Sequence, residues 1–445
     1  MNLIGILIIL LFLQNCSFDD KTGIWENERS ASLNSSKNKI FEGFKKIAIS
    51  EETFNKVIAL DSKIKFKISK PIKTLEWNDI YYNQNNNYPN INYNDSKQII
   101  FKSKKLSRHK INDQILFEKN NLIFSNQKGD IIVYSITENQ IISKFNFYKK
   151  KFKKINKILN LKVNNEVIYT TDNLGYVYAY NYITENVLWA ENYKIPFRSN
   201  LKILKNRLMF SDQNNNLYFI DKNKGNLLRL VPTEETVIKN HFINNLSTDN
   251  LNSLFYLNSY GSLYSLNINS MRINWFINLN KSFDINPTNM FIGNKLVNND
   301  KFIIVSSNSK SYVIDSTNGT IISKKNFSSS IKPIINNNLI FFISKNNLIL
   351  SMDSISGKIL YSYSINDQIA EFLKIKKKNN LNIKNFTILN SQLILFLNNS
   401  YILKFNITGK LNQVLKLPTK INSQPIVING TILYLNNKNK LVKFD

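Results

Sequence analysis

The stretch Val167-Ile168-Tyr169-Thr170-Thr171 runs through a polar turn, Asp172 to Gly175, into Tyr176-Val177-Tyr178-Ala179-Tyr180-Asn181. Two short runs rich in apolar, aromatic and β-branched residues around a turn are typical of a β-hairpin. Related copies recur along the chain, and each ends on a polar residue. The eight closing residues are Ser135, Asn181, Asp221, Asn267, Asp315, Asp353, Asn406 and Asp445.

The spacing of these copies decides the fold class. Their closing residues are separated by roughly 44 residues on average, and short strands repeating every 40–50 residues or so are typical of a β-propeller with one repeat per blade. Eight copies therefore predict an all-β, eight-bladed propeller of four-stranded blades. The hydrophobic content of 43% suits a packed core. Because the copies fill the chain from about residue 110 onward, we expect one large closed domain rather than several.

A turn position recurs six residues before each closing residue. Glycine or asparagine occupies most of these places, and both tolerate the positive φ of a tight hairpin turn. The residues are Gly129, Gly175, Asn215, Gly261, Ser309, Asn347, Ser400 and Asn439.

The N-terminus has the features of an export signal. Leu3 to Leu13 is an apolar run of eleven residues, too short to span a bilayer, and it is followed by Gln14-Asn15-Cys16. Cys16 is the only cysteine in the chain. This segment resembles a bacterial lipoprotein signal, which implies that Cys16 is lipidated and becomes the mature N-terminus; Ser17 after it resembles an outer-membrane sorting signal. The other possibility is an incidental thiol in a sequence cleaved elsewhere.

These features divide the chain into a signal peptide (1–15), a polar tether (16–62) and the propeller (63–445). Residues 63–69 alternate strictly between polar and apolar side chains, as a half-exposed strand does. The last copy ends at Asp445 and so lacks an outer strand of its own. Since an unpaired sheet edge is costly, we expect an N-terminal strand, residues 63–69, to close the ring. The repeat-free residues 77–94 should lead into the first blade or cross one face.

The formal net charge of +28 is a weak guide to function. Lysine, asparagine and isoleucine abound throughout the chain, which indicates compositional bias rather than a nucleic-acid-binding face. Lysine-dense runs at 149–154 and 374–378 fall between the repeats. They are interpreted as solvated loops, with attraction of anionic lipid or of an acidic partner as the alternative.

Eight residues after the closing residue stand Trp189, Trp275 and Tyr361. Together with the Gly175–Asn181 segment and the turns at Gly319 and Gly357, this register resembles the repeat of pyrroloquinoline-quinone-type propellers. The resemblance implies that Trp189, Trp275 and Tyr361 pack between neighbouring blades, which is a structural role.

Nothing in the sequence indicates catalysis. The quinone-dependent dehydrogenases with this repeat need a quinone and a calcium ion, and often a haem or a vicinal disulfide. A chain with one cysteine can form neither a c-type haem site, Cys-x-x-Cys-His, nor an internal disulfide. Its two histidines, His109 and His241, lie in no recognisable motif. No catalytic or metal-ligating residue and no cofactor is therefore expected.

A lipoprotein signal joined to an eight-copy propeller of this repeat type resembles the BamB family of barrel-assembly lipoproteins. The resemblance implies a non-enzymatic scaffold, anchored by lipid on the periplasmic face of the outer membrane. Its partners would be the periplasmic domains of BamA and the rest of the assembly complex. Unfolded outer-membrane proteins are possible further partners, and no binding of nucleic acid is expected. The alternative function is a periplasmic quinone-type oxidoreductase or a small-ligand-binding propeller.

The resemblance also implies a partner-binding pair. In that family an aliphatic–arginine step after a tryptophan-bearing strand contacts BamA, and Phe197-Arg198 stands at the matching position here. A structural role for Arg198 between blades is the alternative. An acidic loop that contributes in the family would fall near residues 242–245, where this chain has no aspartate.

Overall fold

The computed structural model divides the chain into two compact units, Met1–Glu52 and Thr53–Asp445. The structure describes residues 16–18 and 25–27 of the first unit, and 53–235, 244–249, 251–280, 291, 293, 295–307, 309–376 and 381–445 of the second. The first unit holds an antiparallel pair, β1 (Cys16–Phe18) and β2 (Trp25–Asn27), with Cys16 opposite Asn27. The expected signal peptide, 1–15, lies outside the described residues.

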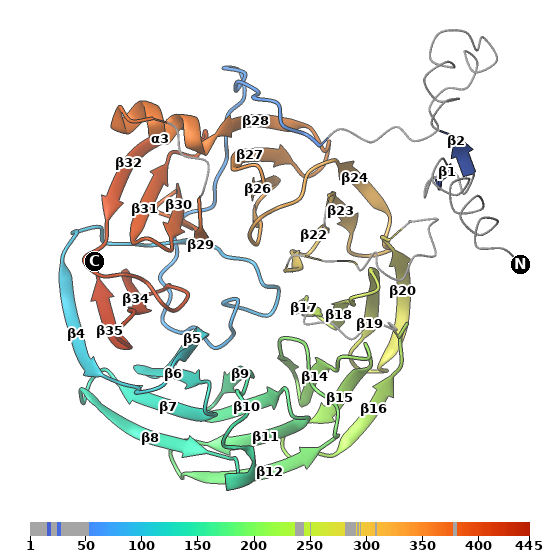
Figure 1. Cartoon of the computed structure of the whole chain (residues 1–445), viewed down its shortest axis with the longest axis vertical. Helices are drawn as coiled ribbons and strands as arrows, with labels where there is room; N and C mark the ends of the chain where they lie inside the picture. The colour runs from blue at the N-terminus through green and yellow to red at the C-terminus, as the bar shows by residue number, and fades with distance from the viewer. Residues whose placement is uncertain are drawn as a thin grey trace, which may run out of the picture. The chain divides into compact units, whose positions relative to one another are not determined.

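Eight antiparallel sheets surround a common axis in the second unit, which confirms the eight-bladed propeller (Figure 1). The innermost strands are β5 (Ile111–Glu118), β9 (Leu159–Asn164), β13 (Lys202–Leu204), β17 (Asn245–Thr248), β21 (Val297–Asn298), β25 (Ile334–Asn336), β29 (Ile383–Leu389) and β33 (Ile426–Ile428). The second strands are β6 (Asn121–Asn126), β10 (Val167–Asp172), β14 (Arg207–Ser211), β18 (Ser253–Leu257), β22 (Phe302–Ser306), β26 (Leu339–Ile343), β30 (Gln392–Leu397) and β34 (Thr431–Leu435).

The two remaining strand positions complete each blade. The third strands are β7 (Asp130–Ser135), β11 (Tyr176–Asn181), β15 (Leu217–Asp221), β19 (Ser262–Asn267), β23 (Ser311–Asp315), β27 (Leu348–Asp353), β31 (Tyr401–Phe405) and β35 (Lys440–Phe444). The outer strands are β8 (Gln140–Asn146), β12 (Asn186–Asn192), β16 (Leu227–Val231), β20 (Arg272–Asn278), β24 (Ile321–Lys325), β28 (Ile359–Ser364), β32 (Leu411–Lys416) and β4 (Ile99–Lys105). Blades are numbered in the order of these lists, so that blade 1 is β5–β8 and blade 8 contains β33–β35 and β4.

The closing residues of the repeat stand at or directly after the end of a third strand, where their side chains can shape a following turn. Asp221 Oδ1, for example, accepts hydrogen bonds from the backbone N–H groups of Asn223 and Lys224, each over 2.9 Å. Asn181 Oδ1 does the same for the two N–H groups at the equivalent place, Ile183 and Thr184. Such side-chain acceptors stabilise a turn locally, which explains why Asp and Asn recur there.

The turn residues before the third strand also behave as expected. Seven of the eight positions have φ between +55° and +97°, and Ser309 borders residue 308, which is not described. The seven are Gly129, Gly175, Asn215, Gly261, Asn347, Ser400 and Asn439.

A β-bulge recurs in every blade, two residues before the closing residue. There the pairing of the third strand with the outer strand shifts register, at Val133, Ala179, Phe219, Ser265, Val313, Ser351, Lys404 and Lys443. Trp189 lies opposite Ala179, and Trp275 opposite Ser265. A bulge re-aims the side chain facing it, here at the position that carries the tryptophans.

The ring is closed by an N-terminal strand, but not by residues 63–69. The strand β4 pairs antiparallel with β35, and Phe101 lies opposite Lys443. This correction has a simple reason: β4 directly precedes β5 of the first blade, so it is joined to it by a short connection like those between other blades. Residues 63–69 form no strand; their side-chain alternation reflects Phe66 and Ile68 packing against blades 6 and 7 while the lysines between them are exposed.

Residues 53–62, which were assigned to the tether, belong to the compact propeller unit. The N–H of Phe54 donates to the carbonyl of Asn326 over 2.7 Å, and Ile58 forms a bridge with Ser362 on β28. The segment therefore runs along the outside of blades 5 and 6.

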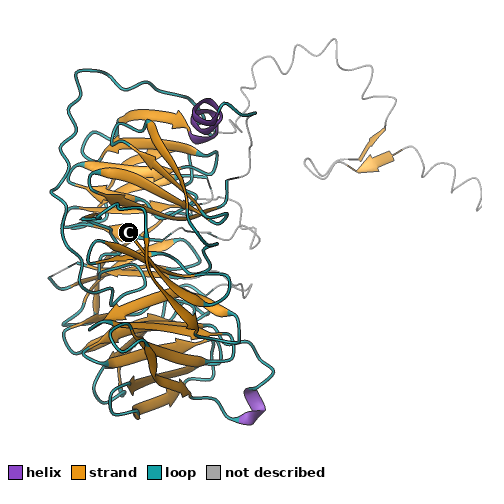
Figure 2. Ribbon diagram, turned by 90° about the vertical axis from the view of Figure 1, so that its left-hand side faces the viewer, coloured by secondary structure: helices purple, strands orange, loops and turns teal. Residues whose placement is uncertain are grey.

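Hydrophobic clusters lie between neighbouring blades and hold the ring together. The cluster between blades 2 and 3, for instance, joins Val177 and Ala179 to Leu208 and Phe210. Connections from each outer strand to the next innermost strand share one face of the ring, because strand direction alternates within a blade. Two of them carry helical turns, η3 (Lys150–Phe152) and α3 (Ile365–Leu373), which Figure 2 shows on the same side. Among the described residues, no helix has the length and apolar character to cross a bilayer.

Candidate functional site

Trp189 and Trp275 each contact the following blade. The indole of Trp189 lies across Gly225, and its Nε1 donates to the carbonyl of Lys222 over 2.9 Å. Trp275 lies across Gly319 in the same way and donates to the carbonyl of Ser316 over 3.3 Å. A Cβ on either glycine would stand within 2.6 Å of the indole, so only glycine fits at this point of the turn.

Tyr361 repeats this arrangement between blades 6 and 7. Its ring lies across Gly409, and its hydroxyl donates to the carbonyl of Ile407 over 3.0 Å. Two other blades have a serine at the position of these aromatic residues, and their contacts differ. Ser323 lies against Gly357, and Ser143 Oγ shares a hydrogen bond with the hydroxyl of Tyr180 over 2.8 Å.

Phe197, one of the two residues expected to contact a partner, is buried. Only 2% of its surface is accessible, and its ring contacts Tyr193, Phe210 and Tyr218, with a centroid separation of 4.8 Å to Phe210. The cause is local pairing, because Phe197 forms a bridge with Asp212 that turns its side chain into the core between blades 2 and 3. Its ring cannot meet a partner without leaving this core.

Arg198 lies beside it, half-buried, where blades 3 and 4 meet. Its N–H donates to the carbonyl of Ser211 over 3.0 Å, and its carbonyl accepts from the N–H of Asn244 over 2.7 Å. Burial lowers the pKa of the guanidinium from its usual value. The backbone of Arg198 thus has a structural role at the junction of blades 3 and 4.

An acidic residue of this region was missed by the sequence analysis. Glu234 lies in the connection between blades 3 and 4, and its backbone carbonyl accepts from Asn215 Nδ2 over 2.7 Å. Its carboxylate accepts from Ser262 Oγ over 2.8 Å and from the hydroxyl of Tyr264 over 2.5 Å. Burial raises the pKa of Glu234, but the hydrogen bonds outweigh this effect, and the pKa lies below its usual value.

The expected place of the acidic loop, residues 242–245, contributes no carboxylate. Residues 242 and 243 are not described, whereas Asn244 is buried and donates from Nδ2 to Asn215 Oδ1 over 3.1 Å. The sequence signal for this acidic site is Glu234-Glu235, at the other end of the same connection.

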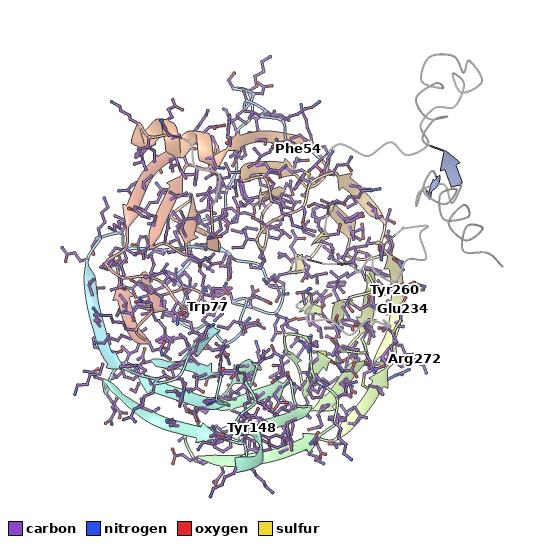
Figure 3. The ribbon with its side chains drawn as sticks, viewed as in Figure 1. Phe54, Trp77, Tyr148, Glu234, Tyr260 and Arg272 are labelled. Carbon is purple, nitrogen blue, oxygen red and sulfur yellow. The ribbon has the colours of Figure 1, made fainter. Side chains whose placement is uncertain are left out.

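The axis of the ring is occupied by the chain's own residues 77–94, here called the axial segment. Figure 1 shows it inside the ring, and Figure 3 places Trp77 there. This differs from a connection that crosses one face. The segment meets the innermost strand, or the turn after it, of all eight blades in chain order: Trp77 with Phe117, Asn78 with Val163, Gln84 with Ile203 and then Thr248, Asn85 with Asn298, Asn87 with Ile335, β3 (Asn90–Ile91) with β29, and Asn94 with Gly430.

Buried charge ties the axial segment to the blades. Asp79 is its only acidic residue, and Oδ2 lies 2.8 Å from Lys202 Nζ and 3.2 Å from Lys162 Nζ. Burial alone would raise the pKa of Asp79, but the two ammonium groups outweigh it, and the pKa lies below its usual value. Lys332 Nζ stands 3.4 Å from the ring centre of Tyr88, and burial, together with Lys202 and Lys295, holds its pKa well below the usual range.

These residues do not fit the cofactors of quinone-dependent dehydrogenases. A calcium ion takes six to eight oxygen ligands, roughly, whereas the one carboxylate of the axial segment is already shared by two buried lysines. A quinone inside the ring would have to displace the segment that joins all eight blades.

The remaining candidates form no reactive group. His109 is exposed, and His241 lies outside the described residues. In the described part of the chain, no three histidine, cysteine or acidic residues are grouped as a metal site would require.

Comparison with known proteins agrees with the fold. A model of the family described as outer membrane protein assembly factor BamB matches residues 123–363, more than half of the chain. BamB from Moraxella catarrhalis superimposes with a TM-score of 0.60 at 12% identity, covering 77% of this chain and 99% of that chain. No curated protein sequence is detectably similar.

Quinoproteins share the fold as well. The quinohemoprotein alcohol dehydrogenase from Comamonas testosteroni gives a TM-score of 0.62 at 10% identity, covering 84% of this chain and 81% of that chain. A europium-containing methanol dehydrogenase gives 0.60 at 10% identity, covering 82% and 89%. Likeness at such low identity concerns the fold alone.

Proposed function

This chain belongs to the family of outer membrane protein assembly factor BamB, and we propose that it is a non-enzymatic scaffold of the barrel-assembly machinery. In this function it docks onto the periplasmic domains of BamA and aids the insertion of outer-membrane proteins. Lipid on Cys16 would hold it at the periplasmic face of the outer membrane. Unfolded outer-membrane proteins are possible further partners.

The observation that carries this proposal is the occupied axis. Propellers that act on small molecules use the space enclosed by the blades or its mouth, as ring-shaped folds offer little other concave surface. Here the axial segment uses that space to join the eight inner strands. The packed centre therefore supports a function at the outer surfaces of the ring.

Of the two faces of the ring, the one that carries the connections between blades is the better candidate for binding BamA. Two of these connections contain Arg198 and Glu234, and both residues bond to backbone or side-chain groups near the junction of blades 3 and 4. Arginine offers five donors in a fixed fork and is common at interface hot spots. Phe197 supports Arg198 from the core rather than contacting BamA itself.

Affinity purification from membranes tests the proposal. A tagged full-length chain, expressed in its own host and extracted in mild detergent, should co-purify with BamA and other assembly subunits. Recovery without any assembly subunit would contradict the scaffold function.

Lipid anchoring has a separate test. Each buried methylene contributes about 0.8 kcal/mol, so an N-terminus with two or more acyl chains stays in the membrane. Cys16→Ser should yield an uncleaved or soluble protein. A processed Ser variant that still fractionates with membranes would show that another anchor exists.

A further inference from the structure

The described lysines of the run at 149–154 are exposed, as expected for a solvated loop, and the run also borders a hollow in the surface. The run lies in the connection between blades 1 and 2, which carries η3, and borders the turn between β6 and β7 and the end of β4. Two adjoining cavities of about 430 and 510 Å³ lie among these three elements and share His109, Asp130 and Lys144. Segments distant in the sequence therefore build one hollow, here called the basic cavity.

The lining of the basic cavity is strongly cationic. Its charged residues are eight cations and one acid: Lys105, Arg108, Lys128, Lys144, Lys149, Lys150, Lys153 and Lys157, with Asp130. At a formal charge of +7, this small part of the surface holds a quarter of the net charge of +28 of the chain. Like charges held this close repel one another, so a bound anion would relieve a cost that the fold now bears.

The acid in the cavity is already satisfied. Asp130 accepts from Asn126 Nδ2 and Asn146 Nδ2, each over 2.7 Å, and Lys144 Nζ stands 3.8 Å away. Burial raises the pKa of Asp130, but these amide hydrogen bonds and the nearby cations outweigh it, so the pKa lies below its usual value. Asp130 therefore pairs with amides at the base of the cavity and leaves most of the positive charge uncompensated.

The floor of the cavity is built by side chains that are fixed in place. Lys157 is only 1% exposed, and its Nζ donates to the carbonyl of Phe152 and lies 5.1 Å from the ring centre of Tyr148. The hydroxyl of Tyr148, labelled in Figure 3, donates to Asp172 Oδ2 over 2.5 Å. Gly129, at φ +87°, lets this ring approach, because a Cβ there would stand 2.4 Å from it.

Lys157 shows the electrostatic cost directly. Burial and the charge of Lys128 lower its pKa from the usual value, and Asp130 and Asp172 offset this only in part. Lys128 Nζ itself has a backbone acceptor, the carbonyl of Lys153, at 3.4 Å. Two ammonium groups near one polar hollow, with carbonyls as acceptors, resemble a site prepared for an oxyanion.

We infer that the basic cavity binds a phosphate group, carried either by a soluble phosphate compound or by an anionic lipid headgroup. Phosphate oxygens would accept hydrogen bonds from the lysines around the rim, and the floor formed by Tyr148 and Lys157 would exclude water beneath them. Nothing in the scaffold function requires this site, so the two proposals stand or fall separately.

Titration calorimetry on the full chain tests this inference with three probes. Inorganic pyrophosphate represents the soluble source, dihexanoyl-phosphatidylglycerol the lipid source, and dihexanoyl-phosphatidylcholine is the zwitterionic reference. We expect pyrophosphate, phosphatidylglycerol or both to bind, and the reference to bind more weakly. Binding of pyrophosphate alone assigns a soluble ligand, and binding of phosphatidylglycerol alone assigns a headgroup.

Matched charge reversals locate the binding. Lys149→Glu combined with Lys150→Glu and Lys153→Glu should weaken binding by about tenfold or more, since charge-assisted contacts are lost and repulsion is added. The control changes the net charge equally at an exposed segment away from the cavity, through Lys63→Glu, Lys65→Glu and Lys67→Glu. The single change Lys128→Gln should weaken binding in the same direction if the triple variant folds poorly.

The inference is overturned if none of the anionic probes binds the unaltered chain. It is equally overturned if the control triple variant loses as much affinity as the cavity variant, because the effect would then be net charge alone. Unchanged affinity in both the cavity variant and Lys128→Gln would also reject it.

Discussion

Lys202 Nζ on β13 donates a hydrogen bond to Asp79 Oδ2 in the axial segment over 2.8 Å, and neither side chain has any exposed surface. The same ammonium group donates to Asn86 Oδ1 over 2.6 Å and to the carbonyl of Asn83 over 3.0 Å. One lysine of blade 3 therefore fixes three points of the segment that occupies the ring axis.

Asp79→Asn should destabilise the whole propeller. It leaves Lys202 and Lys162 buried without their counter-charge, and breaking a buried pair by removing one partner costs about 3–5 kcal/mol. Urea unfolding followed by circular dichroism measures this loss. A control is Asp61→Asn, an exposed acid outside the axis, which should change stability by less than about 0.5 kcal/mol. Equal midpoints for the two variants would show that the axial ion pairs do not support the ring.

The pH dependence of stability should carry the signature of Lys202. Burial, only partly offset by Asp79, lowers its pKa to about 8 from 10.5. Between these two values the folded state releases the proton while the unfolded state keeps it, so Lys202 adds stability as pH rises through this window. The gain is on the order of 1 kcal/mol per pH unit. Lys202→Met removes this titration, so its unfolding free energy should rise less than that of the unaltered chain between about pH 8 and about pH 9.5; parallel profiles would refute the assignment.

Closure of the ring by β4 predicts where a proline is harmful. Phe101 lies opposite Lys443 in the ladder between β4 and β35. Proline has no backbone N–H, so it cannot donate a hydrogen bond to the ladder. Phe101→Pro should lower the melting temperature accordingly. Lys65→Pro, in the segment that forms no strand, should have a much smaller effect. The opposite ranking would restore residues 63–69 as the closing strand.

The contact of Trp189 with Gly225 predicts a coupling between the two residues. Gly225→Ala should destabilise by more than about 1 kcal/mol, because φ is +78° and a Cβ would meet the indole at 2.5 Å. Trp189→Ala removes the clash but opens a gap between blades 2 and 3. The double variant should therefore lose less than the sum of the single variants, by about 0.5–3 kcal/mol. Additive losses would mean that the two residues do not interact.

Truncating Arg198 should weaken partner binding, whereas truncating Phe197 should lower the stability of the fold. Arg198→Ala keeps the backbone bonds of the segment, so we expect a nearly unchanged melting temperature and BamA binding weakened by about 2 kcal/mol, roughly thirty-fold. Phe197→Ala should instead cost about 3–5 kcal/mol of stability, since it empties a packed core position. Arg272→Ala, on the exposed outer strand β20, is the matched control. Full binding by folded Arg198→Ala would remove Arg198 from the interface.

Much of the architecture could be predicted because it is encoded locally. The number of blades, the turn residues with positive φ and the side-chain acceptors at the closing residues each depend on a few consecutive residues. The position of Trp189 eight residues after Asn181 is equally local, since it follows from one turn and one bulge.

By itself, then, the sequence determined an all-β ring of eight repeats and the glycines and asparagines that turn each hairpin. Only the tertiary structure decided which strand closes the ring, that residues 77–94 occupy its axis, that Phe197 is buried and that scattered lysines surround one cavity. Each of these depends on contacts between residues far apart in the chain, such as Phe101 with Lys443 or Asp79 with Lys202. The alternation and composition of a segment show whether it suits burial or strand pairing. Which strand or buried group it pairs with depends on the sheet edges and buried groups that lie near it in the folded chain.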